Sequence, residues 1–197
     1  MRKKQRCPEV TSCYALAAAV LLVTLAASRP TSATTLMQMS LAQMSQAAQL
    51  IVRARCLDNS TRWDAGEIWT FTSFDIEESW LGAAPAQISV RLLGGRVGNL
   101  TSSVSGIPRF SRGEEAILFL EATPRGDFSI VSWEQGTFRI RRDARTGQEI
   151  AVQDTAAFPV FDPAARRFEA SGIRNLPVAT LRSLVNAAIR SGTRRQP

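Results

Sequence analysis

The feature that most constrains the fold is a series of short hydrophobic runs, separated by polar turns, between residues 50 and 141. Residues 50–57 and 88–92 alternate apolar and polar side chains, which is the period-two pattern of a half-buried β-strand. Residues 116–120 are continuously apolar over the length of one strand. Runs this short and this closely spaced predict a mainly β protein.

Residues 67–81 predict a long strand with an irregularity. Trp69 and Phe71 are apolar at odd positions, whereas the next apolar positions, beginning with Phe74, are even. Such a change of phase within one strand is the pattern of a β-bulge, which we predict near residues 72–73. A bulge bends a long strand so that both halves face one core, as a small closed barrel requires.

The remaining β segments are separated by residues that favour turns, such as Gly, Pro, Asn and Asp. Their spacing is that of hairpins. We predict a polar loop over 58–66, a short strand around 103–107, strands 128–133 and 137–141 joined at 134–136, and an edge hairpin within 158–168.

Two helices are predicted at the ends of the β region. Ser40 and Gln43 have the form of a capping box and predict a short helix over 41–48. Apolar residues recur at helical spacing from Leu181 to Ile189, which predicts an amphipathic C-terminal helix. The resulting organisation is a signal peptide at 1–33, a helical lead-in at 34–48, a small OB-like antiparallel β-barrel at 49–170, and a C-terminal helix with a basic tail at 171–197.

The first 33 residues have the form of a secretory signal. A basic start is followed by a small or apolar run over residues 14–27, which is shorter than the roughly 20 residues that span a bilayer. We place cleavage between Ala33 and Thr34, and we expect no transmembrane span afterwards. The protein is therefore expected to be periplasmic or extracellular.

Removal of this leader changes the charge balance and excludes several kinds of catalysis. It takes five of the 24 cations and one of the 17 acids, leaving 19 arginines against 16 acids, with no Lys, His or Tyr. Triads that use His and Schiff-base chemistry that uses Lys are then impossible. Cys56 is the one remaining cysteine and is expected to lie in the core, or alternatively to bridge two chains.

Carboxylates are the remaining candidates for catalysis or metal binding. Asp75 and Glu77 share one strand face and form the only glycosidase-like pair, although a half-buried strand has an ordinary polar face of the same appearance. Asp58, Asp64 and Glu67 lack the spacing of an EF-hand loop. We therefore expect no metal and no cofactor.

The glycine-rich stretch between residues 94 and 113 is the candidate contact loop. It lacks the endings of P-loop and dinucleotide motifs, so its glycines indicate tight turns with positive φ. We assign partner contacts to its arginines Arg96, Arg109 and Arg112, because charged loop residues often carry recognition. The residues expected to shape the turns are Gly94, Gly95, Gly98, Pro108 and Gly113.

Residues 49–55, 68–82, 90–95 and 106–120 together resemble exported bacterial OB-fold proteins of the netrin-like, or tissue-inhibitor-of-metalloproteinase-like, type. The resemblance covers about residues 45–141 and implies a β-barrel with a non-enzymatic, extracytoplasmic role. The animal inhibitors use a cysteine at the mature N-terminus and several disulfides, and this chain has neither. Protease inhibition is therefore not part of what the resemblance implies.

Three functional hypotheses follow from the sequence. The first is an exported, non-catalytic module that binds another extracytoplasmic protein. The second is an OB-type binder of polyanions, either single-stranded nucleic acid or an anionic envelope polymer, which would use Arg139, Arg141, Arg142 and the basic tail. The third is a hydrolase that uses Asp75 and Glu77. The first is favoured, because the arginines of the tail have no aromatic residues between them and nucleic acid is not expected as a partner.

Overall fold

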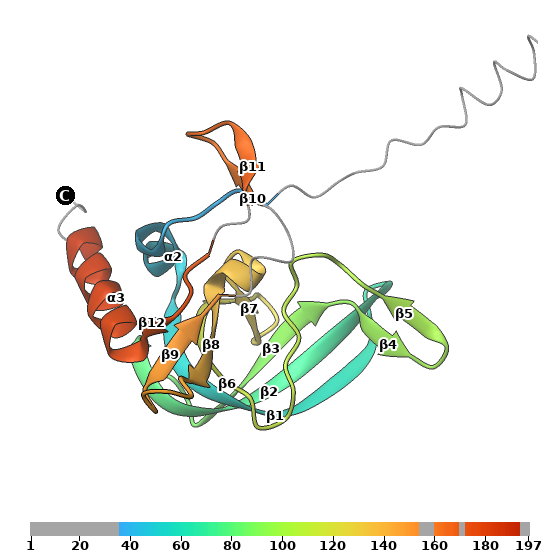
Figure 1. The fold of residues 1–197 in the computed structure, drawn as a ribbon. Helices are drawn as coiled ribbons and strands as arrows, with labels where there is room; N and C mark the ends of the chain where they lie inside the picture. Colours follow the sequence, from blue (N-terminus) through green and yellow to red (C-terminus); the bar gives the residue numbers. More distant parts are fainter. Residues whose placement is uncertain (1–35, 154–159, 170–171, 194–197) are drawn as a thin grey trace, which may run out of the picture. The chain divides into compact units, whose positions relative to one another are not determined.

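The computed structural model of this chain describes residues 36–153, 160–169 and 172–193, and the fold is mainly β (Figure 1). The predicted leader, its cleavage site at Ala33 and Thr34, and the end of the basic tail lie outside these residues. The elements are α2 Leu41–Ala47, β1 Leu50–Asp64, β2 Glu67–Leu81, β3 Gln87–Leu93, β4 Gly95–Val97, β5 Leu100–Ser102, β6 Glu115–Ala122, β7 Phe128–Ile130, a 3-10 turn Trp133–Gly136, β8 Thr137–Arg142, β9 Glu149–Val152, β10 Val160–Asp162, β11 Arg167–Glu169, β12 Leu176–Pro177 and α3 Val178–Thr193.

Five strands close into a ring. The strand order is β1-β2-β3-β7-β6, and β6 pairs again with β1. All of these pairings are antiparallel except the contact between β3 and β7, which is parallel at Val90 and Phe128. Strands β8, β9 and β12 continue the sheet outward from β6.

The sheet separates two hydrophobic cores. Every strand of the ring contributes to the first core, which includes Val52, Phe74 and Leu118. The second lies on the opposite face, where Ile51 and Phe119 pack against residues of α2 and α3. Because successive residues of a strand point to opposite faces, β1 and β6 supply both cores at once.

At the level of residues 72–73 the β-bulge lies in β1 and not in β2, whereas two further register shifts leave Glu77 and Trp80 as extra residues of β2. Cys56 pairs with Phe74 and Asp58 pairs with Ser73, so Leu57 is an extra residue in β1. The pairing of β2 with β3 runs without interruption past Ser73. The prediction of a bulge near residues 72–73 of β2 is therefore wrong, because the bulge at this position lies in the neighbouring strand, opposite those residues.

The sequence pattern of β2 misleads because its outer face is also apolar. Trp69 and Phe71 point away from the ring core, and arginines of the neighbouring strands cover them. Arg62 Cζ lies 3.6 Å from the centroid of the Phe71 ring, and Arg91 Cζ lies 4.8 Å from that of Trp69. A guanidinium stacked on an aromatic ring shields the ring from water as a hydrophobic layer would. The apolar residues of β2 therefore change from odd to even positions although the strand itself has no bulge there.

The two strands predicted over 128–133 and 137–141 are present as β7 and β8, joined by the 3-10 turn, but they do not pair with each other. Strands β7 and β8 both pair with the same strand, β6, at successive positions along it. Ser132 and Trp133 between them have φ of 51° and 57°, and this left-handed backbone displaces the chain from one position to the next. One strand therefore closes the ring while the next extends the sheet.

The two helices lie near their predicted places, whereas the predicted loop over 58–66 and the predicted strand around 103–107 are wrong. The capping box at Ser40 and Gln43 is formed, and α3 packs against α2. Strand β1 continues through most of the predicted loop over 58–66, and the hairpin β4–β5 replaces the strand expected around 103–107. Of the helices in the described residues, none is long and apolar enough to cross a membrane.

Candidate anion-binding pocket

The Leu57 bulge makes one end of the ring interior polar. Before the bulge, even-numbered residues of β1 such as Cys56 face the core, whereas Asn59 and Thr61 face it afterwards. Asn59 accepts a hydrogen bond from Thr72 Oγ1 at 2.6 Å and donates one to the Phe110 carbonyl at 2.9 Å. The hydroxyls of Thr61 and Thr70 are 3.2 Å apart.

Two glycines bring the β4–β5 hairpin against this polar end. Gly94 and Gly95 have φ of +88° and +136°, which L-residues rarely adopt. A Cβ on Gly95 would collide with the side chains of Thr61 and Thr70. Gly95 is therefore required for two reasons: it adopts the positive φ, and its lack of a side chain lets the hairpin lie close to β1 and β2.

Arg109, in the loop after β5, extends its side chain to the polar end of the ring beside Gly94. Its Nη1 donates to Thr70 Oγ1 and to the Gly94 carbonyl, both at 3.2 Å, and its Nη2 donates to the Leu93 carbonyl at 3.3 Å. None of these partners carries a charge. Burial lowers the pKa of the Arg109 guanidinium, and no carboxylate among the described residues opposes that effect.

A neighbouring arginine fixes the position of this loop. Arg139 donates to the Arg109 carbonyl at 3.1 Å, forms ion pairs with Glu114 and Glu134, and lies over the Phe110 ring. Burial alone would lower the pKa of Arg139, but the two carboxylates raise it above its ordinary value. Arg139 is therefore a fully paired structural cation.

Together these groups line a cavity of about 340 Å³. Arg96 and Arg109 both line it, along with hydroxyl groups of Thr101 and Ser102, and its lining contains no carboxylate. Arg96 is exposed, and its Nε donates a hydrogen bond to the Gly98 carbonyl at 3.1 Å. Two guanidiniums without acidic partners, beside hydroxyl donors, can receive an anion.

The predicted contact residues thus separate into two groups. Arg96 and Arg109 come together at the cavity, whereas Arg112 is exposed and does not line it. Pro108 is buried. The predicted turn glycines Gly94, Gly95, Gly98 and Gly113 all have positive φ.

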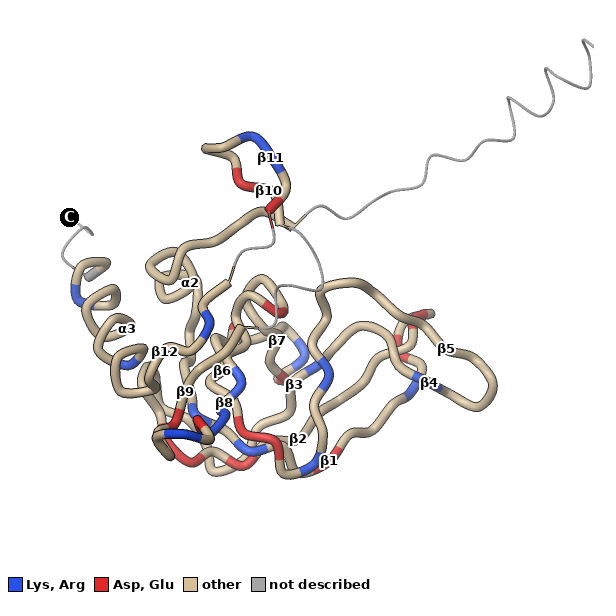
Figure 2. Tube along the Cα trace, viewed as in Figure 1, with Lys and Arg blue, Asp and Glu red and all other residues tan. Residues whose placement is uncertain are grey.

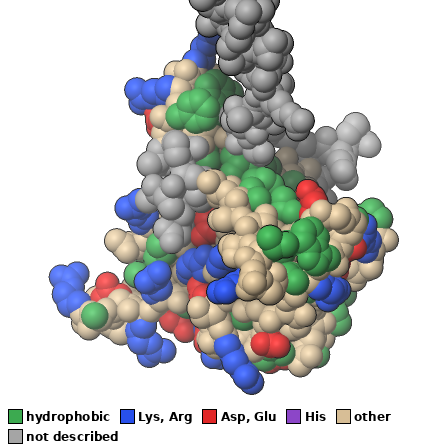
Figure 3. Space-filling model, turned by 90° about the vertical axis from the view of Figure 1, so that its right-hand side faces the viewer, with side chains coloured by type: hydrophobic (Ala, Val, Ile, Leu, Met, Phe, Trp, Pro, Cys, Tyr) green, Lys and Arg blue, Asp and Glu red, His purple; other side chains and the backbone are tan. Residues whose placement is uncertain are grey.

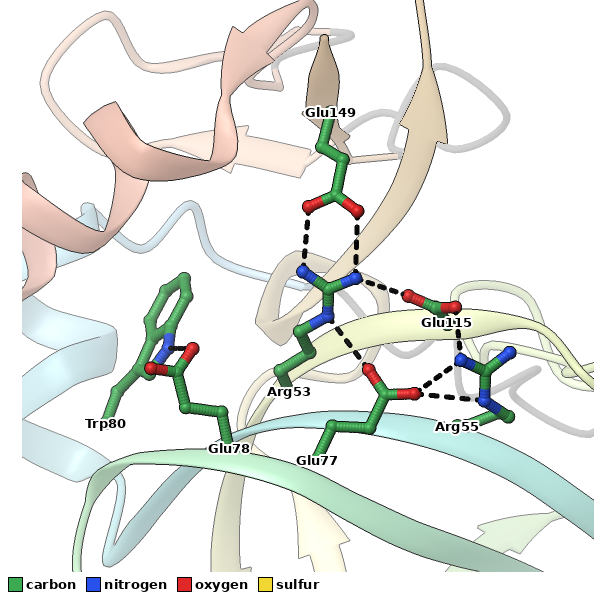
Figure 4. A network of polar contacts seen from close by, with 7 residues as sticks. All are labelled: Arg53, Arg55, Glu77, Glu78, Trp80, Glu115 and Glu149. Carbon is green, nitrogen blue, oxygen red and sulfur yellow. Dashed lines mark hydrogen bonds and ion pairs between the residues drawn. The ribbon is translucent and has the colours of Figure 1, made fainter. Parts of the chain in front are cut away.

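The largest polar network of the sheet lies elsewhere, on the outer face of β1 (Figure 4). Arg53 forms ion pairs with Glu77 at 3.0 Å, Glu115 at 2.6 Å and Glu149 at 2.7 Å. Arg55 pairs with Glu77 and Glu115. Figure 2 shows acidic and basic positions interleaved where β1, β2 and β9 approach one another. This network joins four strands and leaves its cations fully paired.

Two of the candidate catalytic and metal-binding acids, Glu77 and Asp64, form such ion pairs. Glu77 of the proposed carboxylate pair is held by two arginines, and Asp64 is held by Arg91 and Arg125. Among the described residues, no group of three His, Cys, Asp or Glu side chains is placed to hold a metal ion. Hydrogen bonds from Arg125 and Arg91 lower the pKa of Asp64, so this carboxyl group is poorly suited to donate a proton.

The arginines of the polyanion hypothesis are similarly compensated. Arg139 is paired, as described above, and Arg141 and Arg142 border a hollow that also contains Glu114, Glu115 and Glu149. These acids weaken the local positive field on which binding to a polyanion depends.

Cys56 is buried in the ring core, as predicted. Burial is the main factor that raises the pKa of its thiol, and the charge of Glu114 adds to the effect. This position argues against a bridge between two chains.

Sequence reasoning identified two arginines of the cavity and missed its polar floor. Asn59 and Thr70 come from segments assigned to a loop and a strand, and only the pairing of distant strands places them beside Arg109. The available signal was the change from apolar to polar residues after Cys56.

Comparison with known proteins supplies no identity for this arrangement. No protein-family model matches the chain, and no curated protein matches it.

Proposed function

We propose that the protein is an exported, non-catalytic interaction module whose protein partner contacts the end of the ring near β4 and β5. The observation that carries this proposal is the preformed cavity in which Arg96 and Arg109 have no acidic partner. By contrast, Arg53, Arg55, Arg91 and Arg139 of the sheet each form ion pairs with carboxylates. Both arginine residues are exposed, so an anionic group of a partner can reach them and gains affinity by neutralising their charge.

We also propose that the ring is an OB-type barrel of the netrin-like kind. The support is its strand order, in which five strands close with one parallel contact between β3 and β7. An OB-fold is a five-stranded, partly open barrel that binds ligands through its loops and one face. The leader sequence supports export to the periplasm or beyond.

The test is a capture experiment with the tagged full chain, expressed with its own leader in a bacterial host and cross-linked before lysis. The double variant Arg96→Gln, Arg109→Gln is compared with the control Arg145→Gln, Arg166→Gln, whose two exposed arginines lie outside the cavity. A discrete protein captured by the parent and the control, and lost with the cavity variant, supports the proposal. A result in which all three chains capture the same proteins would contradict it.

The same experiment tests the polyanion alternative when it is repeated at about 0.5 M salt. Exposed charge pairs are largely screened at that ionic strength. Capture of nucleic acid or acidic polymer alone, lost at high salt, would replace the protein partner with a polyanion.

A further inference from the structure

Strand β5 borders a second hollow as well as the cationic cavity. This second hollow has a volume of about 370 Å³ and is lined mainly by apolar side chains, among them Trp63, Leu93, Leu100 and Val104. Thr101 and Ser102 line both hollows, so a charged site and an apolar site adjoin at one short strand. Figure 3 looks onto this end of the described chain and shows hydrophobic side chains beside arginine side chains.

Two large apolar side chains of the second hollow are exposed. Trp63 is 51% exposed and Leu100 is 58% exposed. Large apolar residues that gather beside a polar rim commonly mark an interaction site, and Trp and Arg are the residues most enriched at the centres of such sites.

The guanidinium of Arg109 retains donors for a planar anion. Its hydrogen bonds use Nη1 and Nη2, and its Nε has no partner among the described residues. The edge formed by Nε and the second hydrogen of Nη2 has the fork geometry that a carboxylate accepts side-on. Arg96 and the hydroxyls of Thr101 and Ser102 lie around the same cavity.

We propose that the partner supplies a peptide segment in which an acidic side chain is followed closely by an apolar one. The carboxylate binds Arg109 and Arg96, and the apolar side chain packs on Trp63 and Leu100. This inference rests on the proposed function and specifies the chemistry of its partner. A protein segment fits better than a polyanion because the second hollow is apolar and includes Glu67, which repels a continuous run of negative charge.

The probe is an acetylated, amidated hexapeptide of alternating aspartate and leucine, labelled for fluorescence anisotropy and titrated with the full chain at low salt. Matched peptides carry asparagine for aspartate, or alanine for leucine. We expect each replacement to weaken binding at least tenfold. Arg109→Gln is expected to weaken binding at least tenfold and Leu100→Ala severalfold, whereas Arg145→Gln leaves it unchanged.

Two controls keep this test decisive. Thermal unfolding of each variant identifies a loss of fold, and Arg96→Gln, whose side chain is exposed, repeats the charge removal without disturbing Thr70. Equal binding of the asparagine peptide would overturn the proposal, as would binding of inorganic phosphate at the cavity without binding of the peptide.

The outcome also remains separable from that of the proposed function. If partner capture depends on Arg109 but the peptide does not bind, the interaction module stands and the acidic, apolar segment is wrong. If the peptide binds but capture does not depend on Arg109, the cavity recognises an acidic and apolar segment, and the proposed function as an interaction module at this cavity is wrong.

Discussion

At the scale of single residues, the cavity depends on one position where no side chain fits. Gly95 combines a φ of +136° with a Cβ direction that points into Thr61 and Thr70. We expect Gly95→Ala to lower the free energy of unfolding by about 2 kcal/mol or more, because a clash with β-strand side chains adds to the backbone cost. Chemical denaturation with urea measures the change.

Gly98 provides the matched control at the same hairpin. It also has a positive φ, of 58°, but a Cβ there would meet open space. Gly98→Ala should therefore cost only the backbone term, about 1 kcal/mol. If the two variants lose the same stability, close approach of the hairpin is not what requires glycine at Gly95.

At the scale of elements, the bulge in β1 decides which side chains enter the ring. Deletion of Ser60, beyond the bulge, would shift the following residues of β1 by one position, so that Arg62 would face the ring interior in place of Thr61. Burial of that charge costs several kcal/mol, and we expect the variant to lose its cooperative thermal transition. Deletion of Ala144, in the exposed turn after β8, should leave that transition in place.

The elements also show how far sequence reasoning reaches. Segments whose pattern is local, such as the capped helix at Ser40 and the strand at 87–93, were predicted at nearly their true positions. The bulge and the partners of β8 were not, because they depend on which distant strands pair and on arginines that cover Phe71. The cavity shares this limit, since its arginines were visible in a loop and its floor at Asn59 was not.

At the scale of the whole molecule, Arg53 ties the ring to the outer sheet. Its three carboxylate partners lie on β2, β6 and β9, and its own side chain is 20% exposed. Arg53→Met would leave those acids facing one another with Arg55 alone, and we expect a loss of about 2 kcal/mol in the free energy of unfolding. Arg55→Met, at a side chain that is 45% exposed, should lower the free energy of unfolding less than Arg53→Met does in the same urea titration. Equal losses would contradict a special role for Arg53.

The same ion pairs set the response of the whole fold to acid. The hydrogen bond from Arg53 lowers the pKa of Glu149, and hydrogen bonds from Arg125 and Arg91 lower that of Asp64. A carboxylate with a lowered pKa in the folded state stabilises the fold above its unfolded pKa, and this stabilisation is lost as the pH falls through the folded value.

The free energy of unfolding should therefore be nearly constant from pH 7 to about pH 5 and should decrease below it. Urea titrations at successive pH values measure this dependence. Glu149→Gln removes one of the titrating groups, so its stability should start lower at pH 7 and fall less steeply with acid than that of the parent chain. Parallel curves for the parent and the variant would show that the pair between Arg53 and Glu149 does not couple folding to protons, and that the network acts through its geometry alone.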